Sequence, residues 1–193
     1  MPGRIRAFFA LALEGPALAA ALRCLEALRS GPHAASARFV RPEGLHVTLR
    51  FLGAVPPEAV PPLVAAVGQE LCEVPRGPVR LGALHAFPSA RRPRVLALAL
   101  GPAEALGALA AAVERGVVSA GFAPEPRPFR AHVTLARVRE GQRLPVPGPD
   151  VPAPDGSFEA REVVLFESRP GAGGSIYTPL ERLPLRGPVS TQP

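Results

Sequence analysis

His46-Val-Thr-Leu-Arg-Phe51 recurs 86 positions later as His132-Val-Thr-Leu-Ala-Arg137. The chain of 193 residues contains only four histidines and four threonines, so a random order of residues would rarely produce two His-x-Thr segments. The β-branched and apolar residues of both segments favour strands, in which side chains i and i+2 lie on the same face. We therefore expect each segment to form a strand with one polar and one apolar face.

The polar faces carry the candidate chemistry. They hold the histidine and threonine of each segment: His46 and Thr48 in the first, His132 and Thr134 in the second. The apolar faces hold Val47, Leu49 and Phe51 in the first segment and Val133 and Leu135 in the second. Alternation of this kind predicts that the polar faces line a cleft and the apolar faces pack inward.

The surroundings of the two segments also repeat. The apolar run at residues 6–13 resembles the run at 94–100, and each is followed by Gly-Pro and an Ala/Leu-rich helical pattern. Pro16 and Pro102 are again 86 positions apart. We interpret this pattern as an internal duplication. Two halves related by a pseudo-two-fold axis would bring the His-x-Thr faces together across a central groove.

Hydrophobic periodicity predicts the secondary structure. We expect strands near residues 4–13, 45–51, 79–87, 94–100, 132–138, 161–168 and 176–184, and helices at 17–28, 58–73 and 103–119. Residues 144–156 predict a loop, and Gly171-Ala-Gly-Gly174 predicts a hairpin loop. Residues 1–185 are expected to form one domain of two lobes divided near residues 90–94, followed by a flexible tail at 186–193.

The composition limits the possible mechanisms. All 22 basic residues are arginine, giving a net charge of +6, and guanidinium groups are suited to binding phosphate, although a GC-rich genome also enriches arginine. Without lysine, the chain cannot form a lysyl-nucleotide intermediate, a Schiff base or a P-loop. Cys24 and Cys72 lie in Ala/Leu-rich stretches without metal-ligand spacing, so we expect buried thiols and no bound metal.

The N-terminal apolar run is not expected to be a secretory signal. It is short, and Glu14-Gly15-Pro16 interrupts it. No apolar run approaches the length of a transmembrane helix. We therefore expect a cytoplasmic protein that does not associate with membranes.

Paired histidines and threonines suit acid–base chemistry at phosphorus. The unperturbed pKa of histidine lies near neutral pH, so one ring of a pair can be a neutral base while the other is a protonated acid. A threonine hydroxyl beside each ring can donate to a phosphate oxygen and hold phosphorus between the rings. The sequence therefore predicts phosphodiester cleavage without a metal.

These segments resemble the signatures of the 2H phosphoesterases, in particular the RNA 2′,3′-cyclic phosphodiesterases once described as 2′-5′ RNA ligases. The resemblance spans nearly the whole chain and extends to Phe87-Pro-Ser, Arg94-Val-Leu and Tyr177-Thr-Pro-Leu. It implies a bilobal α+β fold, with two antiparallel sheets, outer helices and a central cleft. It also implies hydrolysis of a ribose 2′,3′-cyclic phosphate to a 2′-phosphate, with no cofactor.

The resemblance assigns roles to individual residues. It implies that His46 is the proton donor to the leaving 3′ oxygen and His132 the acceptor that activates water. It further implies that Thr48 and Thr134 hold the phosphate oxygens and that Arg137 neutralises charge in the transition state.

The implied role of Arg137 requires a departure from regular strand geometry. Strict alternation places Arg137 on the face opposite His132, so a β-bulge or a strand end must turn it into the cleft. Phe51 occupies the equivalent position of the first segment.

Arg130 is a candidate contact for phosphate or RNA, as are Arg91 and Arg92. The family often has proline just before the second histidine, where this chain has Ala131.

Several alternatives remain open. The reverse reaction would make the protein an ATP-independent 2′-5′ RNA ligase, although water competes by mass action. A non-catalytic module could instead bind RNA ends in the same cleft. The substrate could be an RNA end or a small cyclic nucleotide, and we expect a monomer. Phe87 and Phe129 could stack on a base or pack in the core.

Overall fold

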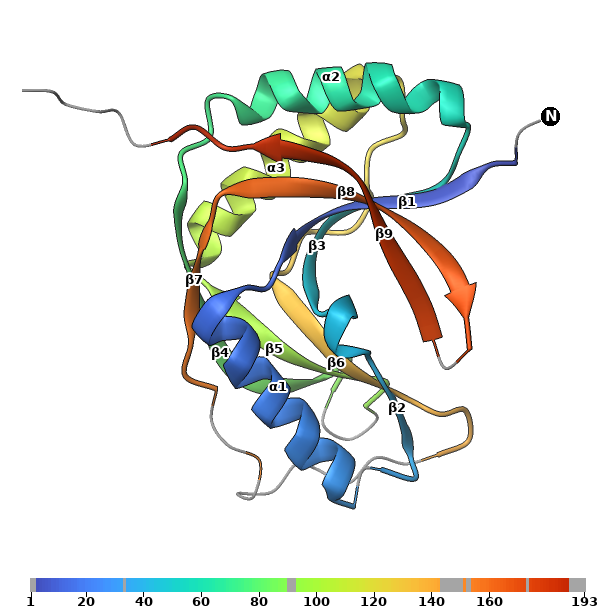
Figure 1. Ribbon diagram of the computed structural model, residues 1–193, viewed down its shortest axis with the longest axis vertical. Coiled ribbons are helices and arrows are strands. Elements are labelled where there is room, and N and C mark those ends of the chain that lie inside the picture. Colours follow the sequence, from blue (N-terminus) through green and yellow to red (C-terminus); the bar gives the residue numbers. More distant parts are fainter. Residues whose placement is uncertain are drawn as a thin grey trace, which may run out of the picture.

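The computed structural model describes residues 3–32, 34–89, 93–142, 151, 154–172 and 174–187, and within them a mixed α+β fold (Figure 1). Its strands are β1 (Ile5–Ala12), β2 (Ala37–Phe39), β3 (His46–Val55), β4 (Gly77–Phe87), β5 (Val95–Gly101), β6 (His132–Val138), β7 (Ser157–Ala160), β8 (Glu162–Gly171) and β9 (Gly174–Pro184). The α-helices are α1 (Gly15–Ser30), α2 (Val60–Leu71) and α3 (Ala103–Ser119). Short 3₁₀ turns occur at Pro42–Gly44 and Pro57–Ala59.

The strands form one curled antiparallel sheet. Its order is β7-β4-β5-β6-β3-β1-β8-β9, and β2 pairs separately with β6. The α+β class that we expected is confirmed, but the two separate sheets are joined. The junction is narrow, because Val47 of β3 and Val133 of β6 are the only registered pair between these two strands in the described part of the chain. The alternation of side chains shows which face is buried, but it does not show which strands pair.

The predicted strands and helices are present, and two short strands were not anticipated. β2 has three residues and pairs with β6, and β7 has four residues and pairs with β4. Neither is long enough to show a hydrophobic period. The hairpin predicted at Gly171–Gly174 is confirmed, because these two residues pair at the end of β8 and β9. Most of the predicted loop at residues 144–156 lies outside the described residues.

The spatial halves of the sheet are not contiguous in the sequence. β4 pairs with β5, whereas β8 and β9 return to β1 at the other side of the junction. Residues 90–92 lie outside the described residues, and the division near 90–94 stays a prediction. Arg186, placed at the start of the expected tail, accepts a hydrogen bond from Arg76 N–H and donates one to Val74 O. Residues 188–193 lie outside the described part.

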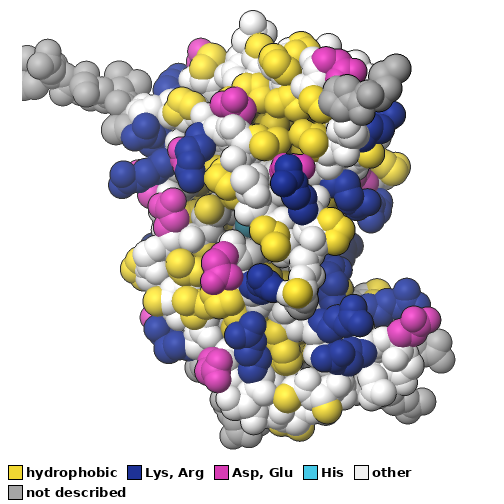
Figure 2. Space-filling view, turned by 45° about the vertical axis from the view of Figure 1, so that its right-hand side comes forward, with side chains coloured by type: hydrophobic (Ala, Val, Ile, Leu, Met, Phe, Trp, Pro, Cys, Tyr) yellow, Lys and Arg dark blue, Asp and Glu magenta, His cyan; other side chains and the backbone are white. Residues whose placement is uncertain are grey.

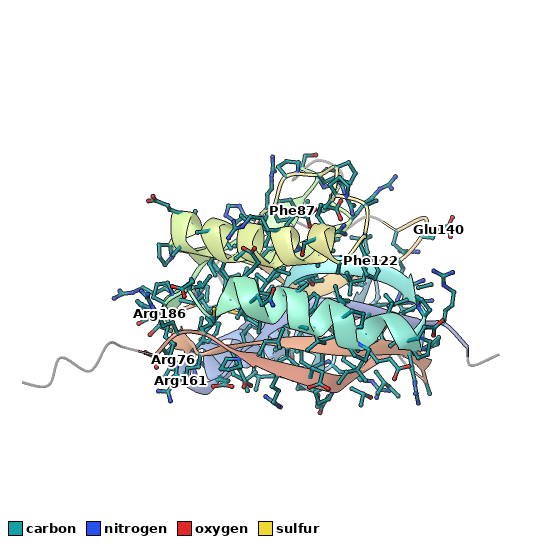
Figure 3. The ribbon with its side chains drawn as sticks, turned by 90° about the horizontal axis from the view of Figure 1, so that it is seen from above. Arg76, Phe87, Phe122, Glu140, Arg161 and Arg186 are labelled. Carbon is teal, nitrogen blue, oxygen red and sulfur yellow. The ribbon has the colours of Figure 1, made fainter. Side chains whose placement is uncertain are left out.

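Helices cover the sheet at both ends of the molecule (Figure 1). α1 contacts β7, whereas α3 contacts β3 and β5, and α2 packs on α3 and β9. Seen from above, α2 and α3 run side by side over the strands (Figure 3). Gly116 permits this close packing, because a Cβ there would lie 2.5 Å from the Cα of Val67.

The two cysteines differ in exposure. Cys24 lies on the inner face of α1 and is fully buried, as we expected, and burial raises the pKa of its thiol. Cys72 is exposed, so the expectation that it is buried is wrong. It follows the last residue of α2, where the chain turns away from the helix face that packs inward.

Candidate active site

Matching β-bulges shape both His-x-Thr strands. In the pairing of β1 with β3, Ala10 lies opposite Thr48 and Phe9 opposite Arg50, so Leu49 is left without a partner in the register. In the pairing of β5 with β6, Ala97 lies opposite Thr134 and Leu96 opposite Ala136, which leaves out Leu135. Each bulge thus falls three residues after its histidine. A bulge reverses the alternation of the side chains that follow it.

The bulges bring one further side chain of each strand to the polar face. Arg137 lines the same cavity as His132 and Thr134, as its candidate role requires. The expectation that Phe51 packs inward with Val47 is wrong, because Phe51 lines this cavity and the residue is 51% exposed. The equivalent positions of the two strands therefore present an aromatic ring and a guanidinium group to one cavity.

Both histidine rings are fixed by the carbonyl group two residues before them. His46 Nδ1 lies 2.7 Å from Gly44 O, and His132 Nδ1 lies 2.8 Å from Arg130 O. A carbonyl oxygen only accepts, so each Nδ1 carries a proton and donates it. In the neutral ring, Nε2 is then the atom with the free lone pair. His46 Nε2 lies 3.0 Å from Thr48 Oγ1, which donates to it in the neutral state.

His46 lies in aromatic surroundings. Its ring centroid is 4.8 Å from that of the buried Phe8 and 5.1 Å from that of Tyr177, which meets it edge-on. Tyr177 also packs against Gly44, where a Cβ would lie 3.2 Å from the tyrosine ring. The pKa of His46 is lowered to about 4, mainly by burial and to a lesser extent by the charges of His132 and Arg137, against the opposing effect of the Gly44 hydrogen bond. The ring is therefore neutral at pH 7 in the ligand-free protein.

A cavity of about 490 Å³ lies between β3, β6, α3 and the loop that precedes β6. Thr48, His132, Thr134 and Arg137 line it, whereas His46 lies behind the lining and contacts Thr48. The candidate contact Arg130 also lines it. A volume of this size accommodates a small organic ligand. Five of the six predicted site residues thus line one cavity, and the sixth, His46, contacts the lining residue Thr48.

Arg50 forms a charged network at the wall of this cavity that sequence reasoning missed. Its Nε lies 2.5 Å from Glu114 Oε2 on α3, and its Nη1 lies 3.5 Å from Glu125 Oε2 in the loop before β6. Glu114 Oε1 accepts a hydrogen bond of 2.8 Å from the backbone N–H of Glu125. A hydrogen bond from Arg127 lowers the pKa of Glu125, so this carboxylate is charged at neutral pH. Charged residues far apart in the sequence give no periodic signal for such a network.

The remaining candidate residues are two aromatic side chains and two arginines. Phe87 and Phe129 both line the cavity, and Phe129 also packs against the core. Arg91 and Arg92 lie outside the described residues.

Within the described residues, no group of three His, Cys, Asp or Glu side chains is arranged to hold a metal ion. None of the described helices is long and apolar enough to cross a membrane.

Comparison with known proteins shows the family of the chain. The family model described as "LigT like Phosphoesterase" matches the chain twice, at residues 13–97 and 99–177. The chain belongs to this family. Each match contains one His-x-Thr segment, and the matches begin as far apart as His46 and His132.

Several known proteins are similar over part or most of the chain. The RNA 2′,3′-cyclic phosphodiesterase of Aeropyrum pernix is 39% identical over 109 residues, which are 55% of this chain and 60% of that relative. The chain therefore spans less than two thirds of that relative's length. The RNA 2′,3′-cyclic phosphodiesterase of Thermus thermophilus is 33% identical over 160 residues, 77% of this chain and 75% of the relative. The crystal structure of E. coli LigT complexed with 3′-AMP has a TM-score of 0.74 and 29% identity, covering 94% of this chain and 98% of that one.

Proposed function

We propose that this protein hydrolyses the 2′,3′-cyclic phosphate at RNA ends to a 2′-phosphate by two-histidine acid–base catalysis without a metal. The observation that carries the proposal is the matched geometry of His46 and His132. Each ring donates its Nδ1 proton to a backbone carbonyl, which leaves Nε2 for proton transfer. His46 Nε2 lies beside Thr48, and His132 lines the same cavity as Thr134. The names of the curated relatives support the substrate class.

The proposed reaction is an in-line displacement at phosphorus. His132 Nε2 takes a proton from water while the water oxygen forms a bond to phosphorus. The bond from phosphorus to the 3′ oxygen breaks, and His46 Nε2 gives its proton to that oxygen. Thr48 and Thr134 donate to phosphate oxygens, and Arg137 stabilises the negative charge that builds up. Proton exchange with solvent then restores both rings.

This assignment requires that the substrate changes the protonation of His46. The ring is neutral at pH 7 in the ligand-free protein because its pKa, lowered mainly by burial, is about 4. A phosphate anion beside the ring favours the charged imidazolium and raises this pKa. Bound phosphate can also accept the Thr48 hydroxyl hydrogen bond that His46 Nε2 accepts in the free protein. Substrate binding would thereby prepare the acid.

The size and the aromatic lining of the cavity suit a nucleotide rather than inorganic phosphate alone. Its volume of about 490 Å³ extends from the two threonines to α3 and includes Phe51, Phe87 and Phe129. Phe51 is backed by Phe8, with 5.6 Å between ring centroids, and exposes its other side. An exposed aromatic face next to a phosphate site suits stacking with a base. The expected monomeric state and cytoplasmic location stay predictions.

The first experiment is product analysis with chelator present. An oligoribonucleotide ending in a 2′,3′-cyclic phosphate is incubated with the protein, and chromatography separates 2′-phosphate from 3′-phosphate ends. We expect only the 2′-phosphate, because the proposed leaving group is the 3′ oxygen. Ligated RNA as the main product would instead indicate the ligase.

Variants test the catalytic pair. His46→Ala and His132→Ala should each lower kcat by about 100-fold or more, since each removes one proton carrier. His85→Ala is the matched control, because His85 lies on β4 outside the cavity lining. Near-native turnover by either site variant would refute the mechanism. Binding of RNA ends without turnover by the native protein would indicate a binding module.

A further inference from the structure

An arginine of β2 lies directly beside the proposed phosphate site. β2 pairs with β6, and the register places Arg38 opposite Arg137. Directly opposed residues of an antiparallel pair project from the same face of the sheet. Arg137 lines the cavity, so Arg38 extends the same cationic face beyond its rim. Both side chains are exposed.

The two like charges have no carboxylate to balance them in the described part of the chain. Arg115, Arg161 and Arg182 are exposed arginines that each pair with a glutamate. Neither Arg38 nor Arg137 makes an ion pair within the described residues. Like charges placed opposite each other across two strands destabilise the pair. A bound anion between them would reverse this effect.

The surroundings of this pair are basic. The chain continues from Arg137 to Arg139, whose backbone N–H donates to Ser36 O just before β2. Glu140, the next acidic residue along the chain, lies in the loop beyond β6 (Figure 3). Figure 2 shows arginine side chains gathered on the part of the surface where Figure 1 places β2 and the end of β6. Few acidic side chains interrupt them.

We propose that Arg38 binds the phosphodiester adjacent to the terminal cyclic phosphate, so that the preferred substrate is an oligoribonucleotide rather than a mononucleotide. This proposal rests on the proposed function, because it assigns the cyclic phosphate to the site of Arg137. Neighbouring strands are about 5 Å apart, and long arginine side chains let the two guanidinium groups reach consecutive phosphates of one strand. Arg38 would contribute to binding and take no part in proton transfer.

The test varies one charge on each side of the contact. Three substrates are compared: a nucleoside 2′,3′-cyclic phosphate, a trinucleotide ending in that group, and the same trinucleotide with an uncharged methylphosphonate at the linkage next to the end. For the native protein, kcat/KM should be about fivefold higher for the charged trinucleotide than for the other two, as expected of one exposed ion pair. The variant Arg38→Gln should lose this preference and keep its activity on the mononucleotide. Arg182→Gln is the control, because its exposed guanidinium pairs with Glu162 instead.

A binding measurement keeps the test independent of turnover. Fluorescence anisotropy gives the Kd of a trinucleotide that ends in a 2′-phosphate. The slope of log Kd against log salt concentration should fall by about 0.7 in Arg38→Gln, as for one lost phosphate contact to a single strand. Equal kcat/KM for the three substrates, or an unchanged salt slope, overturns this inference and leaves the proposed function intact. Absence of hydrolysis of every substrate by the native protein refutes the proposed function, and the salt slope then still tests Arg38.

Discussion

Arg50 is expected to stabilise the site far more than a surface arginine with a similar partner. Its side chain is only 10% exposed, and it connects β3 to Glu114 and Glu125, whose side chains are 28% and 24% exposed. Removing one partner of a buried ion pair costs about 3 to 5 kcal/mol. The partial exposure of both glutamates lets water compensate in part, so we expect Arg50→Ala to lower the free energy of unfolding by about 2 to 3 kcal/mol.

Arg115 is the matched control for this prediction. It pairs with Glu70 at 2.7 Å, but its side chain is 60% exposed, so Arg115→Ala should cost about 0.5 kcal/mol or less. Urea unfolding of both variants measures the difference, and a double-mutant cycle with Glu114→Gln isolates the Arg50 contact. kcat/KM should fall only for Arg50→Ala, because the loop that Arg50 holds lines the cavity. Equal destabilisation by the two variants, or no coupling to Glu114, would refute this reasoning.

Three further predictions concern the pKa of His46, the helix contact and the aromatic wall. Because the pKa of His46 is about 4 in the folded protein against 6.5 in its unperturbed state, the unfolded chain binds an extra proton below pH 6.5. The free energy of unfolding should therefore fall by up to about 3 kcal/mol as pH decreases from 6.5 to 4. Urea titrations should show no such loss for His46→Gln. Bound 2′-phosphate should raise the pKa of His46 in an NMR titration. Gly116→Ala should destabilise the protein by about 3 kcal/mol, because its Cβ would lie 2.5 Å from the Cα of Val67. Gly107→Ala on the same helix is the control: its Cβ meets no atom within 4 Å, so it should stabilise the protein by about 0.5 to 1 kcal/mol. Thermal unfolding measures both changes. Phe51→Ala should raise KM for the cyclic phosphate roughly tenfold with little change in kcat, and an unchanged KM would exclude stacking on this ring.

The repeated His-x-Thr segments were sufficient to predict much of this protein. Alternation along the strand identifies which side chains share a face with His46 and His132, and this information is local. The apolar runs likewise predict the long strands and helices, because each needs one continuous buried face. The chemistry of the candidate site therefore follows from residue types at short spacing.

The tertiary structure decided what depends on partners distant in the sequence. The bulges at Leu49 and Leu135 arise where β3 pairs with β1 and β6 with β5, and they turn Phe51 and Arg137 into the cavity. The low pKa of His46 comes from rings and charges supplied by other strands. The strand sequence predicts alternation, but pairing register and burial are properties of contacts between segments, and these form only when the whole chain is folded.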